Sequence, residues 1–385
     1  MGWVQKRPRK DGTSSYKAYW RDPNNKVKSQ TFELKKNALS HIAKMEVKKD
    51  EGLYIDPNLG KITLAKFWEY FISTSGNSLA ESTRSLYSMQ ARRYILPHLG
   101  NVQLRSLTKP RVKTFLADLQ EAGLGAPSVN SVHRLLRRVL SVAVEDGRIP
   151  VNPAAKVQAP KSSPREMQFL TAKEVAALAD TVEPRYETLI YFLAYTGVRI
   201  GEATALRQKN INVLKRQAHI VEASKEVDGK LYLGPTKTEK NRSVVMPAFL
   251  AEMVAAHIAE FGDRGRPDAL VFTTSTGAVV RQTAFRRRVF QPAAKRAKLA
   301  PGVRPHDLRH TAVALAIQAE WHPKKIQDML GHSSIEVTLG TYGHLFASLH
   351  SEGADQLDAL YRAAAISEES EVTSILSAHG AKSVG

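Results

Sequence analysis

A proline-rich stretch between residues 150 and 168 most constrains how this chain can fold. Pro150, Pro153, Pro160 and Pro164 recur there among Lys, Ser and Ala residues, with no apolar periodicity. Such a composition predicts a linker, whose central part we place at 156–168. At 385 residues the chain is also too long for one ordinary domain. We therefore predict a multidomain α+β fold: a small N-terminal β-sheet plus helix over 1–60, an all-α bundle over 61–155, a mixed α/β, mainly helical domain over 169–350, and a tail over 351–385.

Residues 1–60 show the pattern of a small three-stranded sheet followed by one helix. Aromatic and charged segments at 3–5, 16–20 and 27–32 are separated by turn sequences, and apolar residues at helical spacing follow from Ala38. Basic residues on the predicted strands and turns suit a sheet that enters a DNA groove, although a solvated basic face explains them too. The candidate DNA contacts are Lys6, Arg7, Arg9, Lys17 and Arg21.

Residues 61–155 show the pattern of a helical bundle. The capping-box sequence Ser78–Glu81 predicts a helix whose apolar residues include Leu86 and Met89. Thr108 precedes a further stretch of apolar residues at helical spacing, and Ser128 is predicted to open another helix. Arginines between the apolar positions can contact phosphates while the apolar stripe packs, and ordinary solvated arginines are the alternative. These candidates are Arg84, Arg92, Arg93, Arg134, Arg137 and Arg138.

From residue 169 the pattern changes to mixed helix and strand. Thr171–Glu174 is a second capping box, and the helix through Leu189–Ala194 is predicted to stop at Gly197. The predicted strands are Ala218–Ala223, Lys230–Leu233 and Arg242–Met246. Asp228–Gly229 suits a hairpin turn between two of them. Helices are predicted from there to about residue 348, and the acidic tail predicts one helix followed by disorder.

Charge restricts the class of partner. The formal net charge is +19, and the first 160 residues carry +14 of it. Such an excess favours a polyanion, with nucleic acid as the first candidate, although it is weak evidence alone. The absence of cysteine excludes disulfides and thiolate chemistry and fits a reducing compartment. The longest apolar stretch, Thr188–Val198, is too short to span a bilayer, and the N-terminus lacks the apolar segment of a signal peptide. We therefore expect a cytoplasmic protein.

The segment Pro305–Thr311 concentrates groups that can hold a phosphate. His306 and Arg309 are three residues apart on a predicted helix, so their side chains share a face. An arginine fork donates two hydrogen bonds and keeps its charge, which suits a pentacoordinate phosphorus. His310 lies four residues after His306, so a zinc pair is a rival reading, but it lacks an evident third ligand. Arg199 follows a Gly–Val turn between apolar helices, where an ordinary surface arginine has no special reason to sit.

Tyr342 is a candidate nucleophile. The sequence Ser333–Glu336 is a third capping box, which places Tyr342 on or just after a short helix. A phenol with a pKa near 10 needs a proton acceptor and a positive field, and nearby histidines and arginines supply both. Most of the 12 tyrosines must serve packing, so Tyr342 is a candidate only because the histidine and arginine motifs accompany it in the sequence.

The motifs together resemble a known family. Their order and spacing are similar to those of the tyrosine recombinases, or phage integrases, closely over residues 165–348 and more loosely over the first 155. The resemblance suggests the three-domain layout of phage-type integrases, with an arm-type DNA-binding domain at 1–60 and a core-binding domain at 61–155. The matching segments are Thr196–Glu202, His306–Thr311, Leu330–His332 and Thr338 followed by Tyr342.

The resemblance implies a role for each site residue. Arg199 and Arg309 would grip the scissile phosphate, and His332 would hydrogen-bond to it. His306 would exchange the proton of Tyr342, which would form the 3′-phosphotyrosine. Lys237 best matches the family's catalytic lysine, which protonates the leaving 5′-oxygen. Lys240 is its rival. Glu202 would brace the site, and an acid that serves only its helix N-terminus is an equal alternative.

These roles imply a site-specific DNA recombinase of a phage or other mobile element, working as a homotetramer on double-stranded attachment sites. The phosphotyrosine conserves bond energy, so no cofactor, ATP or metal is expected. A host DNA-bending protein or an excision factor would be a further partner. Two alternatives stay open: a DNA-binding regulator or decayed recombinase without catalysis, and a metal-dependent nuclease built on His306 and His310.

Overall fold

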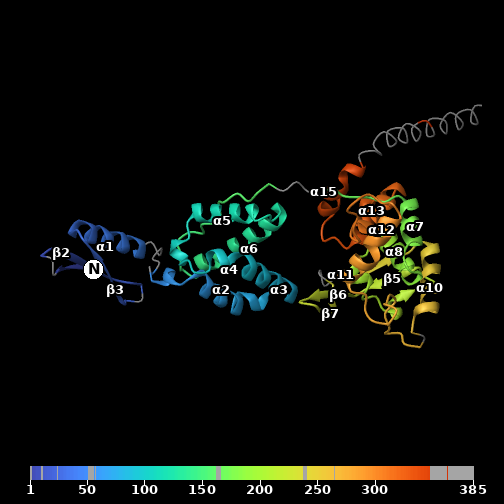
Figure 1. Ribbon diagram of the computed structural model, residues 1–385, viewed down its shortest axis with the longest axis horizontal. Helices are drawn as coiled ribbons and strands as arrows, with labels where there is room; N and C mark the ends of the chain where they lie inside the picture. The colour runs from blue at the N-terminus through green and yellow to red at the C-terminus, as the bar shows by residue number, and fades with distance from the viewer. Residues whose placement is uncertain are drawn as a thin grey trace, which may run out of the picture. The chain divides into compact units, whose positions relative to one another are not determined.

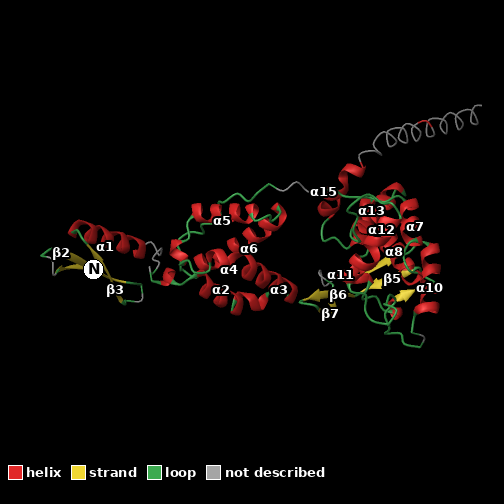
Figure 2. Cartoon of the chain, viewed as in Figure 1, coloured by secondary structure: helices red, strands yellow, loops and turns green. Residues whose placement is uncertain are grey.

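The computed structural model describes residues 2–9, 12–23, 25–50, 56, 58–161, 166–236, 241–263, 265–346 and 362. The chain divides into two compact units, Met1–Pro164 and Arg165–Gly385 (Figures 1 and 2). The first contains a small sheet and a helical bundle, and the second combines helices with short strands. No helix among these residues is long and apolar enough to cross a membrane. The tail predicted at 351–385 lies, apart from residue 362, outside the described residues.

The N-terminal sheet is antiparallel, with strand order β1-β2-β3 and one covering helix. Its elements are β1 (Trp3–Pro8), β2 (Ser14–Arg21), β3 (Val27–Phe32) and α1 (Lys35–Asp50). Ala18 packs with Ala38 and Ile42 of α1 to form the core between helix and sheet. The other face of the sheet is open, and on it Trp3 stacks on Tyr19 with ring centroids 4.8 Å apart. The predicted sheet and helix are confirmed.

The rest of the first unit is helical. Its α-helices are α2 (Leu64–Ser73), α3 (Glu81–Gln90), α4 (Leu96–Leu99), α5 (Lys109–Glu121) and α6 (Ala126–Glu145). Short 3₁₀ turns lie at Leu59–Lys61, Ser75–Ser78 and Leu104–Ser106, and a π-helical turn at Ala91–Ile95 joins α3 to α4. The core is built from apolar residues at helical spacing, including Phe67, Phe71, Phe115 and Leu136, which are buried. Thr108, which precedes the predicted helix, caps α5 by accepting a hydrogen bond from the backbone N–H of Arg111.

Two of the predicted helix starts in this bundle were wrong. Ser78 ends a 3₁₀ turn, and α3 starts after Ala80 without a side-chain cap. The α6 helix starts at Ala126, two residues before Ser128, with Gly125 as its N-cap. Leu86 and Met89 are 44% and 43% exposed, so they do not belong to the core. A capping sequence reports only that a helix can start, and tertiary packing decides where it does.

The second unit is built around α8 (Pro184–Thr196), which packs against α7, α10 and α13. Residues of α8 such as Leu189, Ile190 and Leu193 are fully or almost fully buried. The other helices are α7 (Ala172–Asp180), α9 (Ile200–Ala203), α10 (Ala248–Phe261), α11 (Gln282–Ala284), α12 (Gln291–Arg296), α13 (Asp307–Gln318), α14 (Pro323–Leu330) and α15 (Ile335–Phe346). A 3₁₀ turn lies at Gln208–Asn210, and a π-helical turn at Phe285–Phe290 joins α11 to α12.

The strands of this unit form two separate sheets. The strands are β4 (Ile211–Asn212), β5 (Gln217–Ile220), β6 (Glu222–Val227), β7 (Lys230–Pro235) and β8 (Arg242–Val245). One sheet has the order β4-β5-β8, and β6 pairs with β7 as a hairpin. The single strand predicted at Ala218–Ala223 was therefore wrong, because the chain changes sheets at Val221. The hairpin turn at Asp228–Gly229 is confirmed, with φ of 49° and 74°.

Two local predictions at helix ends are also confirmed. Thr171 and Glu174 form a reciprocal capping box at the start of α7. Gly197 ends α8 in the left-handed conformation, with φ of 63°. A Cβ at Gly197 would lie 3.1 Å from Leu330 and 3.3 Å from Ala312, so glycine serves both the turn and the close packing. This tight turn decides where the next residues, which belong to the candidate site, can point.

Candidate active site

Arg199 and Glu202 are positioned by the turn between α8 and α9. Arg199 is the N-cap of α9, and its Nη1 donates to Glu202 Oε1 at 3.0 Å. Glu202 Oε2 accepts the backbone N–H of Arg199 at 3.0 Å. Glu202 therefore satisfies the helix start and also contacts the Arg199 side chain, while its bracing of a catalytic site stays a prediction.

Glu202 makes its shortest contact with Arg242, the first residue of β8. The Arg242 guanidinium donates from Nη2 at 2.6 Å and from Nη1 at 3.2 Å, which is a bidentate pair. Its Nε donates to the carbonyl of Met329 at 3.2 Å. Burial alone would raise the pKa of Glu202, but the hydrogen bonds and charges of Arg242 and Arg199 outweigh burial and hold the pKa below its ordinary value. Glu202 is thus an anion shared by two arginines.

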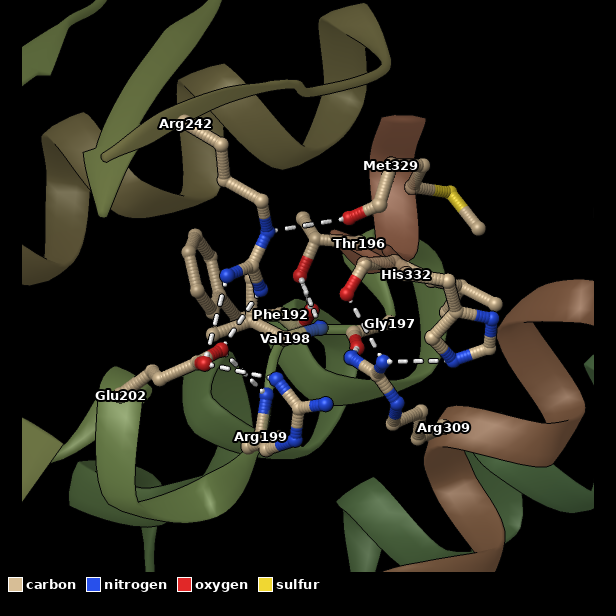
Figure 3. A network of polar contacts seen from close by, with 11 residues as sticks. Phe192, Thr196, Gly197, Val198, Arg199, Glu202, Arg242, Arg309, Met329 and His332 are labelled. Atoms are coloured by element: carbon tan, nitrogen blue, oxygen red, sulfur yellow. Dashed lines mark hydrogen bonds and ion pairs between the residues drawn. The ribbon is translucent and has the colours of Figure 1, made fainter. Parts of the chain in front are cut away.

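Arg309 lies on α13 and is only 4% exposed. Its Nη1 donates to the carbonyl of Gly197, and its Nη2 donates to the carbonyl of Leu330 at 2.8 Å. Nη2 also lies 3.3 Å from His332 Nε2 (Figure 3). Burial and the charge of Arg199 lower the pKa of Arg309 to about 9, which still leaves the group protonated at neutral pH. The α13 helix therefore delivers a fixed cation to the turn that carries Arg199.

His332 follows α14, which ends at Gly331 in the left-handed conformation with φ of 68°. The His332 Nδ1 is 2.9 Å from Thr338 Oγ1 on α15, and Nε2 faces Arg309. Burial and the charge of Arg309 lower the pKa of His332 to about 4, so the ring is neutral at pH 7. Both ring nitrogens are engaged, which fixes the plane of the ring beside the arginines.

Tyr342 lies on α15 and is 2% exposed. Its hydroxyl oxygen is 2.8 Å from His310 Nδ1. Burial raises the pKa of Tyr342, and the charge of Arg309 opposes that rise. The histidine that contacts the phenol is thus His310, one turn after His306, for which the proton exchange is expected. The α15 helix begins at Ile335, and Ser334, rather than the predicted Ser333, accepts the backbone N–H of Glu336.

His306 is the N-cap of α13 and lines an open cavity of about 610 Å³. Burial and the neighbouring His310 lower the pKa of His306 to about 4, so this ring is also neutral at pH 7. Several basic side chains line the cavity, and it borders Ile200 at the start of α9. Its other lining residues include Gln282, Arg286, Arg287 and Arg304.

Several sequence predictions cannot be placed in this geometry. Lys237 and its rival Lys240 lie outside the described residues. Within the described part of the chain, no group of three or more His, Cys, Asp or Glu side chains could hold a metal ion.

The arginines predicted to contact DNA are exposed on α3, the following π-helical turn and α6: Arg84, Arg92, Arg93, Arg134, Arg137 and Arg138.

The predicted contacts on the N-terminal sheet divide between two faces. Arg7, Lys17 and Arg21 alternate onto the open face with Tyr19. Lys6 points to the opposite side from Arg7, and Arg9 follows the end of β1. DNA contact by any of these residues stays a prediction.

The sequence did not indicate that three further residues contact the predicted site residues. Arg242 was assigned only to a strand, although it ends the basic run from Thr236 in which the catalytic lysine was sought. His310 was considered only as a metal ligand. Thr338 was noted as part of a motif without a role, and the structure pairs it with His332. The spacing from His310 to Tyr342 gave no signal, since 32 residues and α14 separate them.

Known proteins match most of this chain in sequence. Residues 168–348 match the model described as the phage integrase family, and residues 63–120 match the phage integrase N-terminal SAM-like domain. The integrase of Mycobacterium phage FRAT1 is 31% identical over 278 residues, which cover 71% of this chain and 81% of that relative. The ICEBs1 integrase of Bacillus subtilis is 28% identical over 288 residues, covering 70% of this chain and 77% of that relative.

Solved structures show the same fold. The Tn1549 transposon integrase in complex with transposon right end DNA is similar with a TM-score of 0.66 at 20% identity, covering 77% of this chain and 99% of that one. The lambda integrase tetramer bound to a Holliday junction gives a TM-score of 0.57 at 18% identity, covering 86% of this chain and 95% of that one. The predicted multidomain α+β class is confirmed.

Proposed function

The chain belongs to the phage integrase family of tyrosine recombinases, and from this premise we propose that it is a site-specific DNA recombinase that cleaves and rejoins DNA through a 3′-phosphotyrosine on Tyr342. One observation carries the proposal. Arg309 bonds to the turn that carries Arg199 and to His332, while the next residue of α13, His310, bonds to the Tyr342 hydroxyl. A phosphate grip and a nucleophile are thus held by neighbouring residues of one helix.

The arginines and histidines would divide the work at the scissile phosphate. Arg199, the more exposed arginine at 33%, and Arg309 would each donate to nonbridging oxygens, where charge grows in the transition state. His306, neutral at pH 7, would act as an N–H donor rather than as a charge. His332, also neutral, would hydrogen-bond to the phosphate once its Nε2 carries the ring proton and exchanges its contact with Arg309 for the phosphate. Arg242 and Glu202 would keep Arg199 aimed at the phosphate. Lys237, with Lys240 as its rival, would donate a proton to the leaving 5′-oxygen.

Cleavage of this kind stores the bond energy of the phosphodiester in the phosphotyrosine link. Rejoining then needs only the attack of a 5′-hydroxyl, so no ATP is required. The arginine side chains supply the positive charge at the phosphate, and we propose that the reaction proceeds in a chelator such as EDTA.

The same proposal assigns the DNA-binding parts. Residues 1–60 would bind arm-type sites, residues 61–155 would bind the core site together with residues 169–350, and 156–168 would link them. Four copies would join two duplexes, as the lambda integrase tetramer on its Holliday junction suggests. The phage and ICEBs1 relatives suggest integration and excision of a mobile element in a bacterial cytoplasm, with a bending protein or excision factor as further partners.

A nicked suicide substrate that carries the attachment site tests this function. We expect the wild-type chain to form a covalent DNA adduct in EDTA that survives denaturing electrophoresis. Tyr342→Phe should bind the same DNA but form no adduct, because it lacks only the phenolic oxygen. An adduct from the Phe variant would place the nucleophile elsewhere, and wild-type binding without any adduct would favour a non-catalytic DNA-binding protein. Cleavage that leaves no adduct and requires added metal would favour the nuclease alternative.

A further inference from the structure

His310 is a histidine beside the candidate site that has no role in the proposed reaction so far. It follows Arg309, which belongs to the proposed phosphate grip, on α13. Its Nδ1 lies 2.8 Å from the Tyr342 hydroxyl, and the two rings are 5.7 Å apart between centroids. Because Tyr342 is 2% exposed, bulk water cannot readily take its proton. The imidazole is therefore the base within reach of the phenol in the described structure.

Side chains from several elements fix the His310 ring in this position. Phe169, ahead of α7, meets it edge-on with centroids 6.4 Å apart. His306, one turn earlier on α13, meets it at 88° with centroids 5.1 Å apart. Ring orientation is thus set by packing as well as by the hydrogen bond, as expected of a side chain that must present one nitrogen in one direction.

The charge state of His310 also suits an acceptor. Burial lowers the pKa of His310, and the charges of Arg309 and Arg304 lower it further, while Asp307 opposes them. The ring is therefore neutral at pH 7. In the tautomer with its proton on Nε2, Nδ1 offers a lone pair to the phenol.

We propose that His310, and not His306, accepts the Tyr342 proton during DNA cleavage, an inference that rests on the proposed recombinase function. The Tyr342 oxygen forms a bond to phosphorus as its proton passes to His310 Nδ1. The bond from phosphorus to the 5′-oxygen breaks, and that oxygen takes a proton from an ammonium donor, the role proposed for Lys237. Rejoining reverses each transfer, so His310 returns its proton to the phenolic oxygen.

In this assignment His306 and His310 face different parts of the site. His306, at the N-cap, lines the basic cavity beside Arg304. His310, four residues later, contacts the nucleophile. The α15 helix is then tied to α13 twice: directly through Tyr342 and His310, and indirectly through Thr338, His332 and Arg309. The proposed base and one arginine of the phosphate grip, Arg309, therefore both lie on the helix that contacts α15.

Substitution at His310 separates a base from a mere positioning group. In His310→Asn, the side-chain oxygen stands near the place of Nδ1 and can accept the phenol's hydrogen bond, but it cannot take the proton. His310→Ala removes both abilities and leaves a space. We expect both variants to cleave a suicide substrate about 100-fold more slowly than the wild type, in line with general-base catalysis. Added imidazole should restore His310→Ala and leave His310→Asn unchanged.

A second substrate excludes a role as the leaving-group acid. With a 5′-bridging phosphorothiolate the leaving thiolate needs no proton, so this substrate relieves loss of an acid but not loss of a base. The His310→Ala defect should persist on it. Thermal unfolding and DNA binding of both variants show whether the fold is retained. His219→Ala, on β5 and hydrogen-bonded to Ser243, is a matched histidine control expected to cleave normally with or without imidazole.

The outcomes distinguish this inference from the function on which it rests. If the wild type forms no adduct, the recombinase proposal itself fails. If the wild type cleaves and folded His310→Asn matches it, His310 only orients the tyrosine and the base assignment is overturned. Full rescue of His310→Ala by the phosphorothiolate would instead make His310 the acid and would overturn the assignment equally.

Discussion

Glu202 accepts hydrogen bonds from Nη2 and Nη1 of Arg242, at 2.6 and 3.2 Å, and so joins α9 to the start of β8. The same carboxylate accepts a hydrogen bond from Arg199. Its charge also raises the pKa of Arg309, against the larger lowering caused by burial. One buried anion therefore stands among the cations that would hold the scissile phosphate. Without Glu202, no anion in the described part of the chain would compensate the electrostatic repulsion between these arginines.

The first prediction concerns the dependence of stability on pH. The pKa of Glu202 in the folded chain lies below its ordinary value of 4.5, so the folded state favours the carboxylate. The stabilisation is therefore fully present above about pH 4.5 and is lost as the pH falls through the folded-state pKa. We expect Glu202→Gln to lower the free energy of unfolding at pH 7 by about 3 kcal/mol, since an uncompensated arginine stays buried.

Urea unfolding of wild type and Glu202→Gln between pH 3 and 7 measures this difference. The gap between the two proteins should narrow at the acidic end of the range. A gap that stays constant with pH would mean that Glu202 acts through shape alone. The exposed Glu336→Gln on α15 is a matched change of charge that should have little effect.

The second prediction contrasts Arg199 and Arg309. Lysine at either position should reduce cleavage roughly 10²- to 10³-fold, because an ammonium cannot replace the two-pronged fork. Arg309→Lys should also destabilise the fold, since the Arg309 guanidinium ties Gly197 to Leu330. Arg199→Lys should unfold almost like the wild type, because that side chain is one-third exposed. Single-turnover cleavage and thermal unfolding test both halves, and equal destabilisation by the two changes would contradict the assigned geometry.

The sequence revealed those parts of the site that lie within short motifs. Gly197 and Arg199 share one turn, and Arg309 has a fixed helical offset from His306, so spacing could predict them. Contacts between distant segments were beyond reach. Arg242 contacts Glu202 across 40 residues, and no spacing rule in the sequence links the start of β8 to the start of α9.

Fold prediction had a similar limit. Helices with strong apolar periodicity, such as α6 and α8, were found because burial imposes that period on the sequence. The break between β5 and β6 was not found, since no turn residue interrupts the sequence at Val221 and only the different partners of the two strands separate them. Likewise, Ser78 has the composition of a helix cap, yet packing starts α3 after Ala80.

The third prediction concerns Thr338, which is fully buried and holds His332 Nδ1 at 2.9 Å. Thr338→Val keeps the shape and removes this hydrogen bond, so the His332 ring can tilt away from Arg309. Loss of about 1 kcal/mol corresponds to roughly fivefold slower cleavage. Thr338→Ser should retain most activity, and binding to the attachment site should change in neither variant. Normal cleavage by the Val variant would show that Arg309 and packing alone orient His332.

The fourth prediction tests the open face of the N-terminal sheet as a separate DNA reader. Arg7, Lys17 and Arg21 share this face with the stacked Trp3 and Tyr19. Replacing the three cations by alanine should weaken binding to arm-type sites and leave cleavage at the core site intact. Each lost phosphate contact should also reduce the slope of log affinity against log salt by about 0.9.

A control of equal charge decides whether position or net charge matters. Lys44, Lys48 and Lys49 lie on α1, which covers the other face of the sheet, and all three are exposed. Their replacement by alanine removes the same charge, so a general electrostatic effect would weaken arm binding as much as the sheet variant does. Footprinting on a native attachment site should instead show arm protection lost only for the sheet variant. If both variants keep the wild-type footprint, the N-terminal sheet is no separate DNA reader and the assignment of residues 1–60 fails.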